Sequence, residues 1–277
     1  MNLEAIDDKM RALTISFSGG EVSVRTGTRV LIAALTTTAF ACAGQVPEPR
    51  TVQGSCAPVY GQDVCTWATL DEAGGLVEFG ATVPVAAIDA APHDMEMVWP
   101  PVASAVLSMP AEVTAAAGVD HLTVYWEAHG HPPGPYLTPH FDFHFYNVAS
   151  AAREAIDCAD TTKPAAFPAG YGMTDVEIPG IGTLIGLCVP AMGMHALLES
   201  EMTGQDLFSG TMVIGYDRGT PLFFEPMLTR ELLVKRQSFD LPMPTVASLP
   251  AGVRYPQRYR AEYHAATDSY RFTFSGI

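Results

Sequence analysis

Alternation of apolar and polar residues is the clearest structural signal in this chain, and it is cleanest over residues 140–146. Three phenylalanines at the odd positions alternate there with His140, Asp142, His144 and Tyr146. Successive side chains of a strand point to opposite faces, so the segment predicts a β-strand whose phenylalanine face packs into a core. The other face carries groups that need partners, and we expect it to line a cavity.

Further strand signals recur along the chain. Residues 76–85, 95–99 and 122–126 are rich in strand-forming residues, and the last of these has the pattern of a half-buried strand. Two hairpins are expected, one joining residues 211–216 to 222–225 and one joining 259–264 to 270–274, each around a short polar turn.

Helical signals are few. A short helix is expected at Ala151–Asp157, with Ser150 as its N-cap. The many short strands predict a mainly β fold (α+β), with a β-barrel or sandwich-like core and short helical insertions. Residues 52–277 should form a single β-rich domain behind a polar tether at 42–51, since no long linker or internal repeat divides them.

Composition supports a folded, turn-rich protein. The chain has 277 residues, is 48% hydrophobic, and contains 22 prolines and 24 glycines, which disfavours long helical bundles. Its formal net charge of −15 makes nucleic acid and anionic membrane surfaces poor partners, because the phosphate term would be repulsive. A small molecule or a further copy of the chain remains open as a partner.

The amino-terminal region predicts export. Arg25 and Arg29 precede an apolar run at residues 30–41 that is too short to span a membrane, so residues 1–41 are expected to be a signal region. Residues 1–24 fit neither a signal nor a domain, and translation could begin near Val24. Cys42 directly after this run resembles a lipoprotein processing site, which predicts a lipid anchor at the cell envelope. Ordinary secretion and a buried apolar helix are the alternatives.

Export gives a reason for the remaining four cysteines. An even number in an exported chain suggests two disulfides. Pairing Cys56 with Cys65 and Cys158 with Cys188 is the most local of the three connectivities that the sequence allows. No Cys-x-x-Cys spacing is present, so neither a zinc ribbon nor a redox motif is indicated.

Histidines and acids concentrate where the strand pattern is strongest, and they suggest a divalent-metal centre with zinc as the first expectation. Imidazole and carboxylate groups from separate elements are the usual ligands of such ions. The expected metal ligands are His131, His140, His144 and His195. The expected general bases, if the centre is catalytic, are Asp142 and Glu225; either could instead bind the metal or orient a ligand.

Spacing limits which donors can act together. On a flat strand, residues four apart lie roughly 13 Å apart at ~3.3 Å per residue, so His140 and His144 barely reach one ion. Asp142 with either neighbour is an easier pair, and other donors must then come from elsewhere. His131 lies on a loop stiffened by two prolines, and His195 follows Gly193, which permits a close backbone approach. We expect His93, His121 and His264 to have structural roles. Of the pair His129 and His131, only one member need be a metal ligand.

Four motifs carry a resemblance: His129-Gly-His-Pro-Pro-Gly-Pro-Tyr136, Pro139-His-Phe-Asp-Phe-His-Phe-Tyr146, Val189-Pro-Ala-Met-Gly-Met-His195 and Phe223-Phe-Glu-Pro-Met227. Together they resemble a family of exported bacterial proteins of unknown function, over about residues 75–275, which implies a shared site but no known reaction. A weaker likeness is to cupins, metal-binding barrels with a His-x-His, a Glu and a later Pro-x-Gly-x-x-His. Here the last motif is shifted, and His140 and His144 stand four apart instead of two.

Two hypotheses about the function therefore remain. The first is an exported, lipid-anchored β-barrel protein with a His-rich metal site, in which a metal-activated water could attack an ester or amide bond. The second is a non-catalytic binding or oligomeric assembly protein of the envelope, whose histidines form a structural hydrogen-bond network. Whether the chain is an enzyme stays open. A serine hydrolase is disfavoured because no Gly-x-Ser-x-Gly occurs.

Overall fold

The computed structural model describes residues 49–204 and 206–277, which belong to one compact unit, Val46–Ile277. The signal region at 1–41, the lipid-anchor site at Cys42 and most of the tether lie outside the described residues. The first strand begins at Arg50, inside the expected tether, because Arg50 and Thr51 pair with Leu70 and Thr69.

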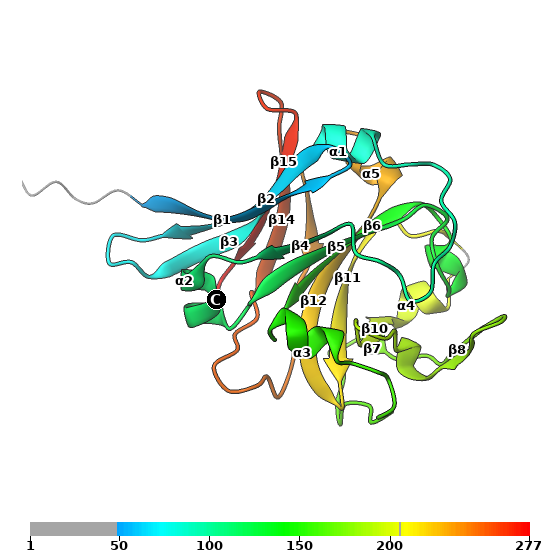
Figure 1. Ribbon diagram of the computed structural model, residues 1–277. Helices are drawn as coiled ribbons and strands as arrows, with labels where there is room; N and C mark the ends of the chain where they lie inside the picture. The colour runs from blue at the N-terminus through cyan, green and yellow to red at the C-terminus, as the bar shows by residue number, and fades with distance from the viewer. Residues whose placement is uncertain (1–48, 205) are drawn as a thin grey trace, which may run out of the picture. The chain divides into compact units, whose positions relative to one another are not determined.

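Two antiparallel sheets form the fold (Figure 1). The six-stranded sheet has the order β1 (Arg50–Val59), β2 (Gln62–Leu70), β3 (Leu76–Pro84), β15 (Ser269–Ser275), β14 (Arg258–His264), β13 (Phe239–Pro242). The seven-stranded sheet has the order β4 (Ala105–Ser108), β5 (His121–Glu127), β6 (His140–Tyr146), β12 (Thr220–Thr229), β11 (Gly210–Asp217), β10 (Met194–Leu198), β7 (Tyr171–Gly172). A separate hairpin pairs β8 (Val176–Ile178) with β9 (Gly182–Leu184).

The remaining elements are short connections. The helices are α1 (Val85–Asp89), α2 (Ala111–Ala117), α3 (Ser150–Glu154), α4 (Glu199–Met202) and α5 (Arg230–Leu233), with 3₁₀ turns η1 (Gly134–Tyr136) and η2 (Ile185–Leu187). The mainly β fold class is confirmed. The core was expected to be either a barrel or a sandwich, and it is sandwich-like. Neither sheet closes into a barrel, because each keeps two edge strands: β1 and β13 in one sheet, β4 and β7 in the other.

Phenylalanine side chains hold the two sheets together. Phe143 packs edge-on against Phe272 with ring centroids 4.9 Å apart, and Phe145 packs against Phe274 at 4.8 Å. All four rings are fully buried. Burial of each such ring contributes roughly 1.5–3 kcal/mol, so this layer fixes which face of β6 points inward. The apolar face predicted for residues 140–146 is therefore confirmed as a core face.

Three local expectations need correction. Residues 95–99 form no strand, because no segment of the described chain pairs with them and they are followed by Pro100 and Pro101, which lack an N–H. The strand at 122–126 is buried on both faces, since loops cover the side that does not face the core. The helix at Ala151–Asp157 is only α3; Ser150 is inside it, and its Oγ donates to Glu154 Oε1 at 3.1 Å instead of capping the helix.

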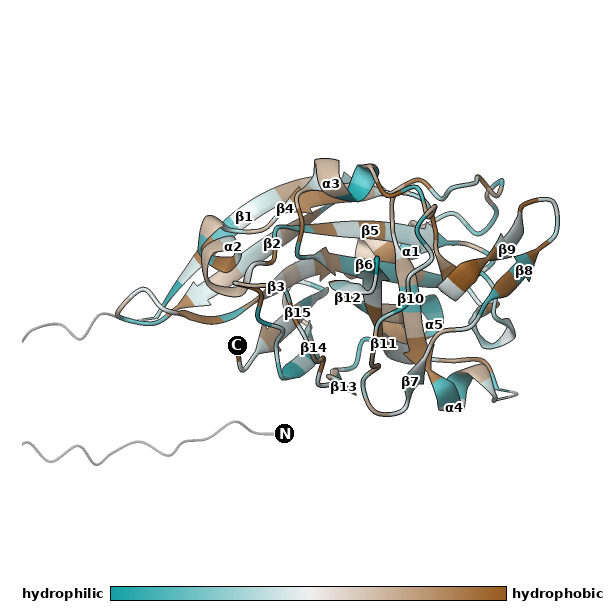
Figure 2. Cartoon of the chain, turned by 90° about the horizontal axis from the view of Figure 1, so that it is seen from below, coloured by the Kyte–Doolittle hydropathy of each residue, from teal (hydrophilic) through white to brown (hydrophobic). Residues whose placement is uncertain are grey.

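Both expected disulfides, Cys56–Cys65 and Cys158–Cys188, are present. They indicate an oxidising, extracytoplasmic environment, because thiols are kept reduced in the cytosol. Within the described ranges, no helix has the length and apolar character needed to cross a membrane. Figure 2 shows that the β8–β9 hairpin projects beside the seven-stranded sheet and carries hydrophobic residues.

Candidate metal centre

The candidate site lies on the face of the seven-stranded sheet that points away from the six-stranded sheet. β6 places His140, Asp142 and His144 on this face because its phenylalanines occupy the other. β12 runs antiparallel to β6 with Asp142 opposite Met227, and the same register brings Glu225 beside His144. His195 comes from β10, on the far side of β11. The strand pairing thus gathers donors that are widely spaced in sequence.

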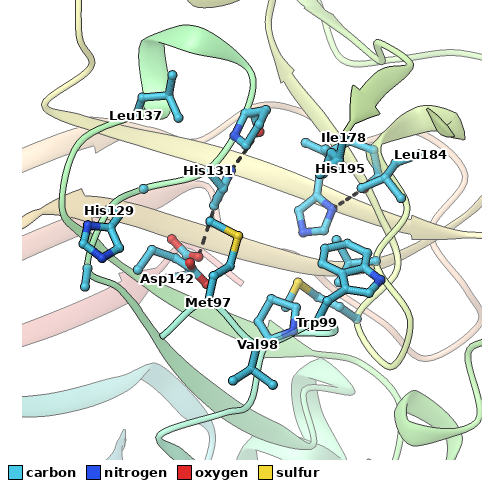
Figure 3. A pocket seen from close by; sticks show the side chains of 18 of the residues that line it. Met97, Val98, Trp99, His129, His131, Leu137, Asp142, Ile178, Leu184 and His195 are labelled. Carbon is cyan, nitrogen blue, oxygen red and sulfur yellow. Dashed lines mark hydrogen bonds and ion pairs between the residues drawn. The ribbon is translucent and has the colours of Figure 1, made fainter. Parts of the chain in front are cut away.

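One set of potential ligands consists of His131, His140 and Asp142, whose donor atoms lie within 4.8 Å of one another. Nε2 of His140 is 3.3 Å from Asp142 Oδ1, and Nε2 of His131 is 3.9 Å from Asp142 Oδ2. His140 is fully buried, whereas the His131 side chain is 31% exposed and borders a cavity (Figure 3). The β5–β6 loop therefore closes this set from the solvent side.

A second set consists of His144, His195 and Glu225, again with donor atoms within 4.8 Å of one another. Nε2 of His144 is 3.4 Å from Glu225 Oε2. The rings of His144 and His195 stand nearly perpendicular, with centroids 5.8 Å apart. All three residues are buried. This set has no partly exposed histidine, so it is the deeper of the two.

Backbone carbonyls hold three of the four imidazoles in the orientation of metal ligands. The Nδ1 atom of His131 lies 2.9 Å from Pro132 O, that of His140 lies 2.6 Å from Thr138 O, and that of His195 lies 2.9 Å from Leu187 O. A proton on Nδ1 makes each of these hydrogen bonds and leaves the lone pair on Nε2. Metal-ligating histidines typically have this arrangement. Neither ring nitrogen of the buried His144 has a hydrogen-bond partner among the residues that the structure describes.

Burial controls the charge of these groups. It lowers the pKa of His140 and His144 well below the usual value, and it lowers the pKa of His195 to about 4. It also raises the pKa of Asp142 and Glu225 well above the usual carboxyl range, with neighbouring acids adding to the effect. The imidazoles are thus neutral, as metal ligation requires, while the carboxylates lack a compensating positive charge.

The residues fit a metal ion in donor type and spacing. Bonds of ~2.0–2.1 Å arranged tetrahedrally put neighbouring ligand atoms ~3.3 Å apart, as in the two imidazole–carboxylate pairs. The buried atoms His140 Nε2, Asp142 Oδ1 and Glu225 Oε2 have no hydrogen-bond partner in the described part of the chain, which is costly unless something else binds them. Two imidazoles and one carboxylate in each set leave coordination positions open, as in catalytic rather than structural zinc sites.

The structure divides the residues expected at one centre into two sets. His131 lies with His140, and His144 lies with His195, so four histidines do not surround a single ion. Asp142 and Glu225 each contribute an oxygen to one set. The side chain of His129 is 52% exposed, with Nε2 3.5 Å from Asp94, at the rim of the cavity.

The three histidines expected to be structural lie outside both sets. His121 is buried, stacks on Tyr146 and has Nδ1 3.0 Å from Asp120 Oδ1. His93 and His264 are exposed.

Three residues near the site were missed by the sequence reasoning. Glu127 pairs with His140 across β5 and β6 and lines the same cavity, and burial raises its pKa to about 7. Tyr125 pairs with Asp142, and its ring stands edge-on to His144 at 5.2 Å. Arg153, buried in α3, donates to the Tyr125 hydroxyl at 3.4 Å. The alternation of β5 already placed Glu127 and Tyr125 on one face; only its pairing with β6 was lacking.

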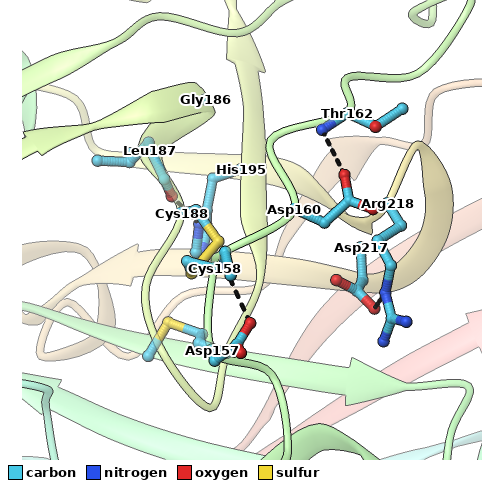
Figure 4. Close-up of a disulfide and its surroundings, with 12 residues drawn as sticks. Asp157, Cys158, Asp160, Thr162, Gly186, Leu187, Cys188, His195, Asp217 and Arg218 are labelled. Carbon is cyan, nitrogen blue, oxygen red and sulfur yellow. Dashed lines mark hydrogen bonds and ion pairs between the residues drawn. A yellow bond between two sulfur atoms is a disulfide. The ribbon is translucent and has the colours of Figure 1, made fainter.

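A disulfide and a glycine position His195 (Figure 4). Leu187, whose carbonyl accepts from His195, immediately precedes Cys188 of the Cys158–Cys188 bond. Gly193 has φ +119°, and a Cβ there would lie 3.0 Å from Tyr216 O and 2.8 Å from a Leu222 methyl. The close backbone approach expected at Gly193 is thus confirmed.

Fold and site together define a β-sandwich with two histidine–carboxylate sets under a cavity. A family model described as TTHB210-like, for the hypothetical protein TTHB210, matches residues 71–126. This segment runs from the end of β2 into β5 and contains no member of either ligand set. No curated protein and no solved structure matches the chain.

Proposed function

We propose that this chain is an exported metalloprotein that binds divalent ions, zinc first, at the two histidine–carboxylate sets. The observation that carries the proposal is a group of buried ligand atoms that have no partner within residues 49–204 and 206–277: His140 Nε2, both ring nitrogens of His144, Asp142 Oδ1 and Glu225 Oε2. Native proteins rarely leave such atoms unpaired, and here they come from two residues of each set, which His131 or His195 completes at ligand spacing.

Metal-assisted hydrolysis of an ester, amide or related bond is the chemistry that the site supports best. A bound divalent ion supplies a nucleophile by lowering the pKa of its water and polarises a carbonyl oxygen. Asp142 and Glu225 are the general bases proposed from the sequence, although each also supplies an oxygen to a ligand set. Glu127 borders the same cavity outside both sets and can hold a proton at its carboxylate.

Elemental analysis of the mature protein, purified without a histidine tag, tests the proposal. We expect two divalent ions per chain in the wild type. His131→Ala and His195→Ala should each lose one ion, because each removes a member of one set. His264→Ala is the matched control, since that side chain is 44% exposed and distant from both sets, and it should keep both ions. Metal-free wild-type protein would refute the proposal.

Attachment to the membrane through lipid on Cys42 is part of the same proposal. The two disulfides support an extracytoplasmic location, and the cysteine after residues 39–41 supports lipid modification. Mass spectrometry of the mature amino terminus should find acylated Cys42, and Cys42→Ser should release the protein from the membrane fraction. An unmodified terminus at another position would show ordinary secretion instead.

The alternative is a metal-free envelope protein in which a protonated Asp142 or Glu225 donates to an imidazole. Their raised pKa values favour the protonated acids when no cation is bound. The separations of 3.3 and 3.4 Å are long for such hydrogen bonds, so metal binding is the better account.

A further inference from the structure

The ligand sets open into a cavity of about 480 Å³, which is in the size range of small-molecule sites. Three segments that are distant in sequence form its walls: residues 95–102, the β5–β6 loop and the chain from β8 to β10. His131 and Asp142 of the first set and His195 of the second line its floor (Figure 3), and Glu225 of the second set lines the same cavity. A molecule in the cavity can therefore meet both sets.

Exposed apolar side chains concentrate at this cavity. Met95, Met97, Val98, Val102, Leu137 and Ile181 all line it and all expose more than a third of their surface. Only Val77, Val106 and Leu207 share that exposure elsewhere among the large hydrophobic side chains of the described residues. A gathered apolar rim of this kind marks a binding surface, because scattered apolar residues would not collect in one place.

Charge narrows the type of ligand. The charged side chains in the cavity are all acidic, namely Glu96, Glu127, Asp142 and Glu225. No lysine or arginine lines it in the described part of the chain. In the metal-free protein, a phosphate, sulfate or carboxylate would find no fixed cation among these residues and would lose its hydration against apolar surface. A charged amine would meet these acids but would lose its hydration against the exposed apolar side chains of the rim.

We infer that the cavity binds an uncharged, apolar small molecule whose hydrocarbon part lies against the Met97 and Val98 rim. Its polar functional group is directed to the floor, where the two ligand sets are. The second statement rests on the proposed metal function; binding of the hydrocarbon part does not. The concave shape leading to buried polar atoms favours a small ligand over a flat protein contact.

A pair of fluorescent probes tests the inference. N-phenyl-1-naphthylamine is neutral, and 8-anilinonaphthalene-1-sulfonate has the same aromatic frame with an anionic group. We expect saturable, one-to-one binding of the neutral probe to the mature protein, before and after chelator treatment. The anionic probe should bind the chelator-treated protein at least tenfold more weakly. Absence of saturable neutral-probe binding, or equal affinity for both probes, would overturn the inference.

Variants locate the binding. Met97→Glu should weaken the neutral probe about tenfold, because Met97 is 70% exposed on the rim and a charge there opposes apolar contact. Val106→Glu, at an exposed position outside the cavity, should leave binding unchanged. Equal loss in both variants would indicate adventitious surface binding. If the wild type is a dimer that Met97→Glu converts to a monomer, the rim is a contact between subunits. Either of these two results would contradict the inference. Metal content is measured separately, so failure of the metal proposal leaves this test intact.

Discussion

The Leu187 carbonyl oxygen lies 2.9 Å from His195 Nδ1, and Leu187 is joined directly to Cys188 of a disulfide. The bond to Cys158 therefore restrains the residue that orients His195. His195 Nε2 is free to bind an ion only while this hydrogen bond holds the proton on Nδ1. The second ligand set thus depends on a covalent link in the loop beside it.

Removal of this disulfide should weaken metal binding selectively. We expect the double variant Cys158→Ala, Cys188→Ala to lower affinity at the second set about tenfold, the usual cost of losing an outer partner of a ligand. Titration calorimetry on chelator-treated protein measures this. The matched control replaces Cys56 and Cys65, which join β1 to β2, and its metal affinity should stay unchanged. Equal effects of the two double variants would contradict the assignment.

Chelation should destabilise the wild-type protein. Ions bound only to the folded state stabilise it by about 2.7 kcal/mol at a free concentration of 100 times Kd, so their removal should lower the melting temperature by several degrees. Calorimetry of the double variant His140→Ala, His144→Ala should show no chelator effect, since each set has lost a buried ligand. A wild-type melting temperature indifferent to chelator would contradict metal binding.

Glu127 should make the metal-free protein less stable as the pH rises from about 4.5 to about 7. Burial raises the pKa of this carboxyl from 4.5 to about 7, so the folded state keeps the proton over a range where the unfolded chain releases it. The contribution of this proton to the free energy of unfolding is complete below pH 4.5. It declines by up to about 3 kcal/mol as the pH rises to about 7. Urea unfolding of Glu127→Gln should lack this decline relative to the wild type. Parallel pH profiles of the two proteins would refute the prediction.

Gly193→Ala should disturb the approach of the chain to β10. The new Cβ would lie within 3.0 Å of Tyr216 O, at a φ that disfavours side chains. We expect a loss of roughly 1–3 kcal/mol in the free energy of unfolding and weaker metal binding at the second set. Gly252→Ala also has a positive φ but has open space around it, so it separates backbone strain from the steric contact.

The sequence predicted local elements well because their signals are local. The phenylalanine face of β6 and the hairpin around residues 217–220 follow from period-two alternation and turn residues, and both are present. The division into two ligand sets could not be predicted, because it depends on the pairing of β12 with β6, which residues 147–219 separate in sequence, and on the position of β10. Residues 95–99 show that a local signal alone can mislead. Their side chains favour a strand, but no strand of the described chain pairs with them.

Anomalous X-ray diffraction of zinc-loaded crystals, measured on both sides of the zinc absorption edge, tests the central claim most directly. We expect two anomalous peaks per chain: one within bonding distance, ~2.0–2.2 Å, of His131, His140 and Asp142, the other of His144, His195 and Glu225. Density that instead joins each carboxyl to an imidazole by a hydrogen bond, with no anomalous peak at either set, would contradict it.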